Sequence, residues 1–197
     1  MSASEGWLNL EIHPLTSERW DDLELLFGSH GADGGCWCMF FRLPHKQFTA
    51  QQGDENRAAF KHLVEDGPAP GLIAYVEGNP AGWVAVAPRG EYGRLSRSRI
   101  LKPLDQQEVW SVVCFFIGKA YRKRGVSTQL LKAAVIFAAE RGAKIIEGYP
   151  VDLTDRQYPD AFAYHGTLSS FLEAGFVEVA RRSPTRPMMR YLISEKE

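Results

Sequence analysis

The stretch VWSVVCFFIGKAYRKRGVSTQLLKAAVIFAAERGAKIIEGY, residues 109–149, decides the fold. Residues 109–117 are apolar on both faces, which is typical of a strand in the centre of a sheet. A short basic loop follows, and residues 126–141 carry apolar side chains at helical spacing until Gly142 ends the pattern. Residues 144–149 have the composition of the next strand. The order of strand, loop, helix and strand predicts a βαβ-like crossover.

The flanking segments predict further elements around this unit. Four glycines within residues 28–35 predict a loop, and the apolar, aromatic residues 36–42 fit a short strand or a buried loop. Residues 89–107 are basic and irregular. The remaining predicted elements are helices over 16–27, 54–66 and 168–174 and strands over 8–12, 72–77, 81–87, 176–180 and 188–193. We expect a hairpin turn at Gly78-Asn79, an antiparallel pair at the end, and an α/β protein with one sheet.

Length and composition favour one domain over residues 1–197, with residues 1–7 as a flexible N-terminal segment. The chain is 45% apolar and 24% charged, and its net charge of −1 argues against nucleic acid or a membrane as partner. Neither a secretory signal nor a membrane-length apolar run is visible in the sequence. Three cysteines give no disulfide framework, so we expect a cytoplasmic protein and leave a homodimer open.

The basic loop before the long predicted helix is the segment best suited to a ligand. A helix N-terminus presents unpaired backbone N–H groups and a partial positive charge, and both favour a phosphate group. Gly125 lacks a Cβ where a phosphate would approach, Ser127 and Thr128 add hydroxyl donors, and residues 122–124 are basic. The spacing fits neither a Walker P-loop nor a dinucleotide fingerprint. A solvated strand-to-helix turn is the alternative interpretation.

Arg122-Lys123-Arg124-Gly125-Val126-Ser127 resembles the acetyl-CoA signature Q/R-x-x-G-x-G/A of the GCN5-related N-acetyltransferase (GNAT) superfamily. Arg122 and Gly125 match it, whereas Ser127 stands where the family has Gly or Ala. Downstream, Phe171-Leu172-Glu173-Ala174-Gly175-Phe176 resembles the family's Y-x-x-x-G-F ending of the last helix. The resemblance covers residues 8–193. It implies a single mixed, mostly antiparallel sheet with a central splayed strand pair and flanking helices.

The resemblance also implies an N-acetyltransferase that moves the acetyl group of acetyl-CoA, its co-substrate, to a primary amine of a small molecule or peptide by direct attack. No metal is expected. Arg122 would stand at the first position of the signature. Phe116 and Ile117, at the end of the central strand, would hold the pantetheine arm through backbone groups, and the edge of that strand would polarise the thioester carbonyl. The CoA pyrophosphate would be held by backbone amides near Arg124, Gly125, Val126, Ser127 and Thr128.

The catalytic groups are not those usual in the family. Ser111 occupies the position of the general-base glutamate, so a water relay or Glu108 would have to serve. Phe171 occupies the position of the leaving-group tyrosine and has no proton to give. Tyr164 or His165, just before the last helix, could supply that proton. Structural roles for both residues, with proton transfer through water, are the alternative.

The segment Gly34-Gly35-Cys36-Trp37-Cys38-Met39-Phe40-Phe41-Arg42 allows three interpretations. Cys36 and Cys38, with His30 and His45, could bind zinc, although a single intervening residue points the two thiols to opposite faces of a strand. The cysteines could instead be small buried apolar groups. We favour the third, which follows from the family resemblance: the acceptor pocket is shaped by Trp37, Phe40, Phe41 and Arg42, with the arginine matching an anionic part of the acceptor.

Two other functions stay open. The missing catalytic glutamate and tyrosine allow a non-catalytic acyl-CoA-binding sensor module, and the cysteine segment allows a zinc-stabilised interaction domain. A second basic cluster at Arg94, Arg97 and Arg99 is interpreted as a solvated loop, with contact to the CoA ribose phosphate or to an acidic acceptor as the alternatives. No motif in the sequence identifies the amine acceptor.

Overall fold

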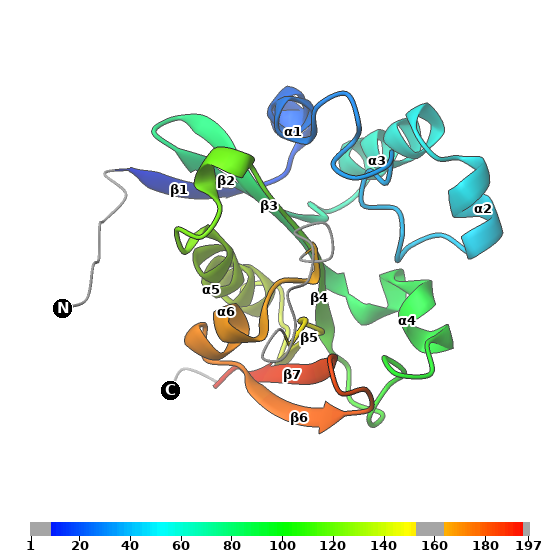
Figure 1. The fold of residues 1–197 in the computed structure, drawn as a ribbon, viewed down its shortest axis with the longest axis vertical. Coiled ribbons are helices and arrows are strands. Elements are labelled where there is room, and N and C mark those ends of the chain that lie inside the picture. Colours follow the sequence, from blue (N-terminus) through cyan, green and yellow to red (C-terminus); the bar gives the residue numbers. More distant parts are fainter. Residues whose placement is uncertain (1–8, 153–163, 195–197) are drawn as a thin grey trace.

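The computed structural model describes residues 9–152 and 164–194, so the expected flexible segment 1–7 lies outside the described residues (Figure 1). In chain order the helices and strands are β1 (Leu10–Pro14), α1 (Trp20–Phe27), α2 (His45–Ala50), α3 (Asp54–Asp66), β2 (Gly71–Val76), β3 (Asn79–Pro88), α4 (Gly93–Arg97), β4 (Trp110–Ile117), α5 (Val126–Ala139), β5 (Ile145–Gly148), α6 (Leu168–Glu173), β6 (Val177–Arg181) and β7 (Pro187–Leu192). Within the described ranges seven strands form one sheet in the order β1-β2-β3-β4-β5-β7-β6. β4 and β5 are parallel and every other neighbouring pair is antiparallel. The expected fold class is confirmed.

The predicted elements recur with small shifts at their ends, and α3 has the bounds predicted for it. The hairpin turn differs by one residue, because Glu77 and Gly78 have φ of 49° and 77° and Asn79 already belongs to β3. Two consecutive positive φ angles suit a two-residue hairpin loop. Residues 36–42 form turns whose side chains are largely buried, and α2 was not anticipated from the sequence.

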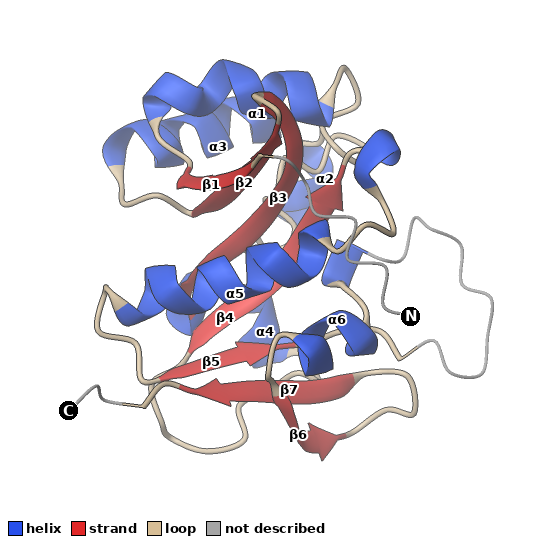
Figure 2. Cartoon of the chain, turned by 90° about the vertical axis from the view of Figure 1, so that its left-hand side faces the viewer, coloured by secondary structure: helices blue, strands red, loops and turns tan. Residues whose placement is uncertain are grey.

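Helices cover both faces of the sheet, and Figure 2 shows α5 and α6 in front of it with α4 behind. Because successive residues of a strand point to opposite faces, β3 supplies both cores. Trp83 packs with Phe27 of α1 and Phe60 of α3, whereas Val84 packs in the core that contains Leu130 of α5. The layers are therefore helix, sheet and helix. No helix within the described residues is both long and apolar enough to cross a membrane.

β4 and β5 pair over a short distance and then separate. Their parallel register runs only from Trp110 opposite Ile146 to Val112 opposite Gly148, although β4 continues to Ile117. Val113 is an extra residue in β4, since Val112 pairs with Val86 and Cys114 with Ala85 on the neighbouring strand. Such a bulge bends and twists its strand. Among the described residues, no strand pairs with the edge of β4 that faces β5 beyond Val112.

A buried ionic network lies at the base of this splay. Glu147 of β5 is fully buried and accepts hydrogen bonds from Arg89 Nη1 (2.6 Å), Arg190 Nε (2.9 Å) and the Tyr149 hydroxyl (2.7 Å). The Tyr149 hydroxyl also bonds to the hydroxyl of Ser111 on β4 at 3.0 Å. These bonds join β4, β5 and β7 where β4 and β5 still run together.

Candidate functional site

A cleft of about 750 Å³ lies beside the end of β4 and the start of α5. It is bounded by four segments: the glycine-rich loop after α1, the end of β4, the basic loop with the first turn of α5, and the residues that lead into α6. The lining residues are Ala32, Asp33, Phe115, Phe116, Ile117, Tyr121, Arg122, Lys123, Gly125, Val126, Ser127, Thr128, Tyr164, Gly166, Thr167, Ser169, Ser170 and Glu173. The structure therefore brings together most of the residues expected to face CoA. The cleft is also lined by the loop after α1 and by residues before and within α6, which were not predicted to face CoA.

The start of α5 is open to this cleft. Gly125 has φ 81° and ψ 0°, in the left-handed region, and no side chain caps the helix there. A Cβ added to Gly125 would meet no protein atom within 4 Å, so it would project into open space. The first N–H groups of an α-helix have no partner inside the helix, which leaves those of Val126, Ser127 and Thr128 available to a phosphate.

The side chains of this segment, unlike its backbone N–H groups, are hydrogen-bonded to other parts of the protein. The Ser127 hydroxyl bonds to that of Ser170 at 3.1 Å, and the Thr128 hydroxyl donates to Glu173 at 3.0 Å. These bonds connect α5 to α6 and occupy two hydroxyls that were expected to extend the donor set. Arg122 Nε donates to the carbonyl oxygen of Ile117 at 3.1 Å, which fixes the loop to the end of β4.

Arg124 is exposed and is not among the residues that line the cleft. Its neighbours Arg122 and Lys123 line it, so the positive charge of the loop still reaches the start of α5. Lys123 has φ 59°, a value rare for a residue with a side chain. The left-handed backbone at Lys123 and Gly125 turns the chain sharply from β4 into α5.

Tyr164 is the predicted acid that the structure places in the cleft. Burial raises the pKa of its hydroxyl above the ordinary value, and Arg186, which is hydrogen-bonded to it, offsets only part of that rise. The phenol is therefore protonated at neutral pH and can donate a proton. Its ring lies 4.1 Å from that of His165, centroid to centroid.

His165 is 5% exposed and does not line the cleft. One of its ring nitrogens bonds to the backbone carbonyl of Val113, the bulge residue of β4, while Nδ1 finds no partner among the described residues. Burial, reinforced by the charge of Arg186, lowers the pKa of His165 to about 3. A neutral imidazole held in this way braces the bulge and is a poor proton donor.

The two residues suggested as bases lie at the other end of β4. Ser111 is fully buried and bonded to Tyr149, and Glu108 is exposed just before the strand begins. A strand rises about 3.3 Å per residue, so Glu108 lies roughly 20 Å from Phe115 along the chain. The structure brings neither residue to the cleft, because β4 runs away from them toward it.

The residues expected to shape the acceptor pocket also lie elsewhere. Trp37 lines a separate hollow of about 570 Å³, bordered by Glu24 of α1 and Arg57 of α3. Phe40 packs under the guanidinium of Arg94, 4.0 Å from the ring centroid to Arg94 Cζ. Arg42 forms an ion pair of 2.5 Å with Glu91, so its charge is already neutralised. Within the described chain none of these side chains lines the cleft.

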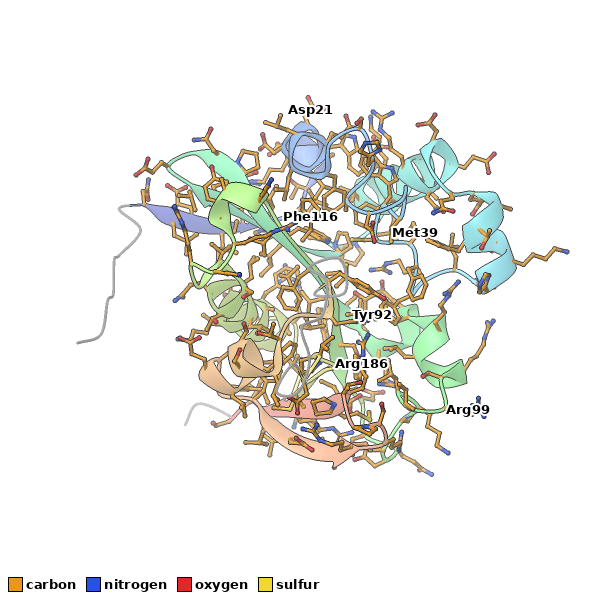
Figure 3. All side chains as sticks on the ribbon, viewed as in Figure 1. Asp21, Met39, Tyr92, Arg99, Phe116 and Arg186 are labelled. Atoms are coloured by element: carbon orange, nitrogen blue, oxygen red, sulfur yellow. The ribbon has the colours of Figure 1, made fainter. Side chains whose placement is uncertain are left out.

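Phe41, the fourth of this group, packs against His165 with ring centroids 5.5 Å apart. The second basic cluster is only partly the expected solvated loop. Arg94 belongs to α4 and donates from Nε to the carbonyl of Leu43 at 2.9 Å. Arg99 is exposed at the outer edge of the molecule, away from Tyr92 and Phe116 in the middle of the view (Figure 3).

The three cysteines lie close enough to interact with one another. The Cys38 thiol lies 3.8 Å from that of Cys114 on β4 and accepts a hydrogen bond from the indole of Trp83 at 3.0 Å. Burial, with a smaller effect from Cys38, raises the pKa of Cys36 to about 12, and the hydrogen bond from Cys38 together with burial raises that of Cys114. The thiols of Cys36 and Cys114 are therefore protonated at neutral pH. The described residues contain no group of three His, Cys, Asp or Glu side chains arranged to hold a metal.

Asp33 and the hydroxyl-bearing residues before and within α6 line the cleft without having been predicted. The signal available for Asp33 was its place among four glycines, which indicates a loop that can pack closely but not what the loop faces. The hydroxyls of Thr167 and Ser170 lie 2.9 Å apart, and that of Thr167 also accepts a hydrogen bond from the Ser170 backbone at the start of α6. Neither Asp33 nor these hydroxyl-bearing residues follow a sequence spacing that defines a known motif.

A mixed sheet with a splayed parallel pair beside an uncapped helix start is the architecture of acyl-CoA-dependent N-acyltransferases. A family model described as the acetyltransferase (GNAT) family matches residues 37–156, and the chain belongs to this family. The predicted family is thereby confirmed, and with it acetyl-CoA as co-substrate and acetyl transfer as the general chemistry. No curated protein sequence matches the chain.

Solved structures share the fold at low identity. PaiA N-acetyltransferase from Thermoplasma acidophilum, in complex with coenzyme A, is 13% identical with a TM-score of 0.50, covering 94% of this chain and 100% of that one. PH1933 from Pyrococcus horikoshii OT3 is 13% identical with a TM-score of 0.54, covering 95% and 100%. Aminoglycoside N-acetyltransferase AAC(6')-Iy, in complex with CoA, is 16% identical with a TM-score of 0.53, covering 88% and 91%. These similarities extend to the fold alone.

Proposed function

We propose that this protein transfers the acetyl group of acetyl-CoA to a primary amine of a small molecule or peptide by direct attack of the amine on the thioester. One observation carries the proposal: a single cleft joins the uncapped start of α5 to the unpaired edge of β4. The start of α5 suits a pyrophosphate. The edge of β4 suits the amide groups of the pantetheine arm and the thioester carbonyl, which it would polarise. The size of the cleft, about 750 Å³, suits an extended ligand.

The residues of the cleft fit acetyl-CoA in two places. The backbone N–H groups of Val126, Ser127 and Thr128 would bind the pyrophosphate, and Gly125 leaves room for it because its missing Cβ points into open space. The exposed positive charge of Lys123 and Arg122 would add attraction at that end. Phe116 and Ile117 would pair their backbone groups with the pantetheine arm, since no strand of the described ranges pairs with this edge of β4 there.

The proton transfers fall to Tyr164 and water in this proposal. The amine nitrogen forms a bond to the thioester carbon, the carbon–sulfur bond breaks, and the nitrogen releases one proton to water to give the neutral amide. Tyr164, whose raised pKa keeps the phenol protonated, donates its proton to the departing thiolate and is reprotonated by water. His165 holds the backbone of Val113 and so positions the edge of β4. Ser111 and Glu108 take no part, because both lie away from the cleft.

The test is a thiol-release assay over a panel of primary amines, combined with calorimetric titration of acetyl-CoA. We expect Gly125→Glu to abolish acetyl-CoA binding and thiol release, because it places a carboxylate where the pyrophosphate would lie. Gly142→Glu is the matched control, since Gly142 also has a positive φ, 82°, and open space beyond its Cα, at the far end of α5. Equal loss in both variants, or undiminished binding in Gly125→Glu, would overturn the assignment.

A non-catalytic acyl-CoA sensor is the second candidate. The observation in its favour is that neither usual catalytic position offers a proton. Ser111 is sequestered with Tyr149, and Phe171 is fully buried between Phe115 and Phe176. Thermal stabilisation by acetyl-CoA without thiol release on any amine of the panel would favour the sensor over the enzyme.

A further inference from the structure

Glu173 places a carboxylate at the end of the cleft where the pyrophosphate is proposed to bind. It lines the cleft together with the first turn of α5. In that turn the Thr128 hydroxyl donates a hydrogen bond of 3.0 Å to Glu173 Oε2. The carboxylate is therefore held by one of the three residues whose N–H groups would meet the pyrophosphate. A negative group beside an anion site is unexpected, because like charges repel each other.

No cation neutralises this carboxylate within the described part of the chain. The hydrogen bond from Thr128 is its polar contact there, and the basic residues Arg122 and Lys123 of the same cleft form no ion pair with it. The contrast is with Glu147, which is buried and shared by two arginines. Glu173 is exposed, so its charge faces both the solvent and the cleft.

The start of α5 explains why a carboxylate is favourable here when the cleft is empty. α5 has no acidic residue in its first turn and no side-chain cap, whereas the partial positive charge of a helix start favours a nearby anion. Glu173 supplies that anion from α6, through its bond to Thr128. A pyrophosphate bound to the same turn would supply the charge instead and would be repelled by Glu173. The carboxylate therefore favours the empty site over the filled one.

We propose that Glu173 weakens the hold of the cleft on the CoA phosphates, so that the product CoA is released readily. This inference rests on the CoA site proposed above and concerns how strongly that site binds. The phosphates are identical in acetyl-CoA and in CoA. An interaction with them therefore holds the product as firmly as the co-substrate and does not speed the chemical step. A carboxylate that limits this interaction favours turnover over retention.

Glu173→Gln is the central variant, because glutamine removes the charge while its side-chain oxygen can still accept the hydrogen bond from Thr128. We expect the dissociation constant of CoA, measured by titration calorimetry at low ionic strength, to fall by about threefold to fivefold. In about 1 M salt, where charges are screened beyond about 3 Å, this difference from the parent should largely disappear. In Glu173→Ala the Thr128 hydroxyl also becomes available to a phosphate, so the dissociation constant should fall at least as far.

The matched control is Glu140→Gln, which changes the net charge by the same amount. Glu140 follows α5 at its far end, and a helix of 14 residues is about 20 Å long, which exceeds the Debye length at physiological salt. An unchanged or raised dissociation constant in Glu173→Gln, or an equal fall in Glu140→Gln, would overturn the proposal. Weaker binding in Glu173→Ala with unchanged binding in Glu173→Gln would also overturn it, because Glu173 would then only tie α6 to α5.

A further comparison separates this proposal from the proposed function. Tighter CoA binding in Glu173→Gln supports the proposal even where no amine of the panel is acetylated, a result that rejects the proposed function alone. Unchanged binding in Glu173→Gln, together with the loss expected for Gly125→Glu, rejects this proposal and leaves the CoA site in place. No CoA binding to the parent, or undiminished binding in Gly125→Glu, rejects both.

Discussion

Replacing Glu147 with leucine tests whether the buried network holds β4, β5 and β7 together at the base of the cleft. Leucine has nearly the size of glutamate but removes the charge that Arg89 and Arg190 share. Arg190 keeps a second partner, because Asp105 lies 2.6 Å from its Nη1. Arg89 keeps only the neutral oxygens of Tyr149 and Leu101 and is left as a buried cation without a counter-charge.

The expected loss follows from this arrangement. Removing one partner of a buried ion pair costs about 3–5 kcal/mol, and here one arginine is stranded while the other is not, so we expect about 4 kcal/mol. For 197 residues the entropy of unfolding is about 0.4 kcal/mol/K, so the Tm should fall by about 10 °C. That value includes the loss of the hydrogen bond that the Tyr149 hydroxyl donates to Glu147.

Urea unfolding followed by circular dichroism, with thermal melting alongside it, measures the effect. Glu140→Leu is the control, because Glu140 is exposed at the end of α5 and should change the stability by less than about 0.5 kcal/mol. In the double variant Glu147→Leu with Arg89→Met no cation is stranded, and most of the stability should return. A loss below about 1 kcal/mol for Glu147→Leu, or no recovery in the double variant, would refute the reasoning.

Three further predictions follow from the cleft and its surroundings. Gly148→Ala should destabilise the protein by about 1–3 kcal/mol, measured by urea unfolding, because its Cβ would lie 2.1 Å from the ring of Phe171; a neutral result would contradict the close packing of α6 on β5. Tyr164→Phe should lower kcat by roughly 10²-fold or more with acetyl-CoA binding unchanged. An unchanged kcat would mean that water, and not Tyr164, protonates the departing thiolate. The His165 pKa of about 3 lies below the ordinary histidine value of 6.5, so the unfolded chain takes up the proton first as the pH falls. Stability should therefore drop by about 2 kcal/mol between pH 7 and pH 5, and His165→Gln should remove that slope in unfolding titrations at the two pH values.

The parts of the fold that could be predicted depend on local pattern. Three signals were local: the apolar run of β4, the helical spacing of α5 and the glycine between them. Each of these can be recognised from residues that are near neighbours in the sequence. The same locality made Gly125 identifiable, because a helix start has the same backbone requirements in any protein. Tyr164, which lines the cleft, was predicted as an acid for a similar reason, since it stands just before the predicted last helix; its catalytic role stays a prediction.

The rest of the site depends on distant contacts that no local pattern contains. Arg42 is neutralised by Glu91, 49 residues further along the chain, so its charge could not be discounted from the sequence. Ser111 is bonded to a tyrosine 38 residues later, at the end of β4 that lies away from the cleft. Asp33 lines the cleft from the loop after α1, whose Gly31 packs closely on Trp37. A sequence shows that such side chains exist, but the packing decides which of them meet.

The splay between β4 and β5 bears on how the proposed CoA site would tolerate substitution. The wall proposed for CoA consists largely of main-chain groups, on the edge of β4 and in the first turn of α5. Main-chain groups survive almost any side-chain replacement, so most substitutions in that wall would leave its hydrogen-bonding groups in place. At Gly125 a side chain would instead project into the space proposed for the pyrophosphate, and that position should tolerate replacement least.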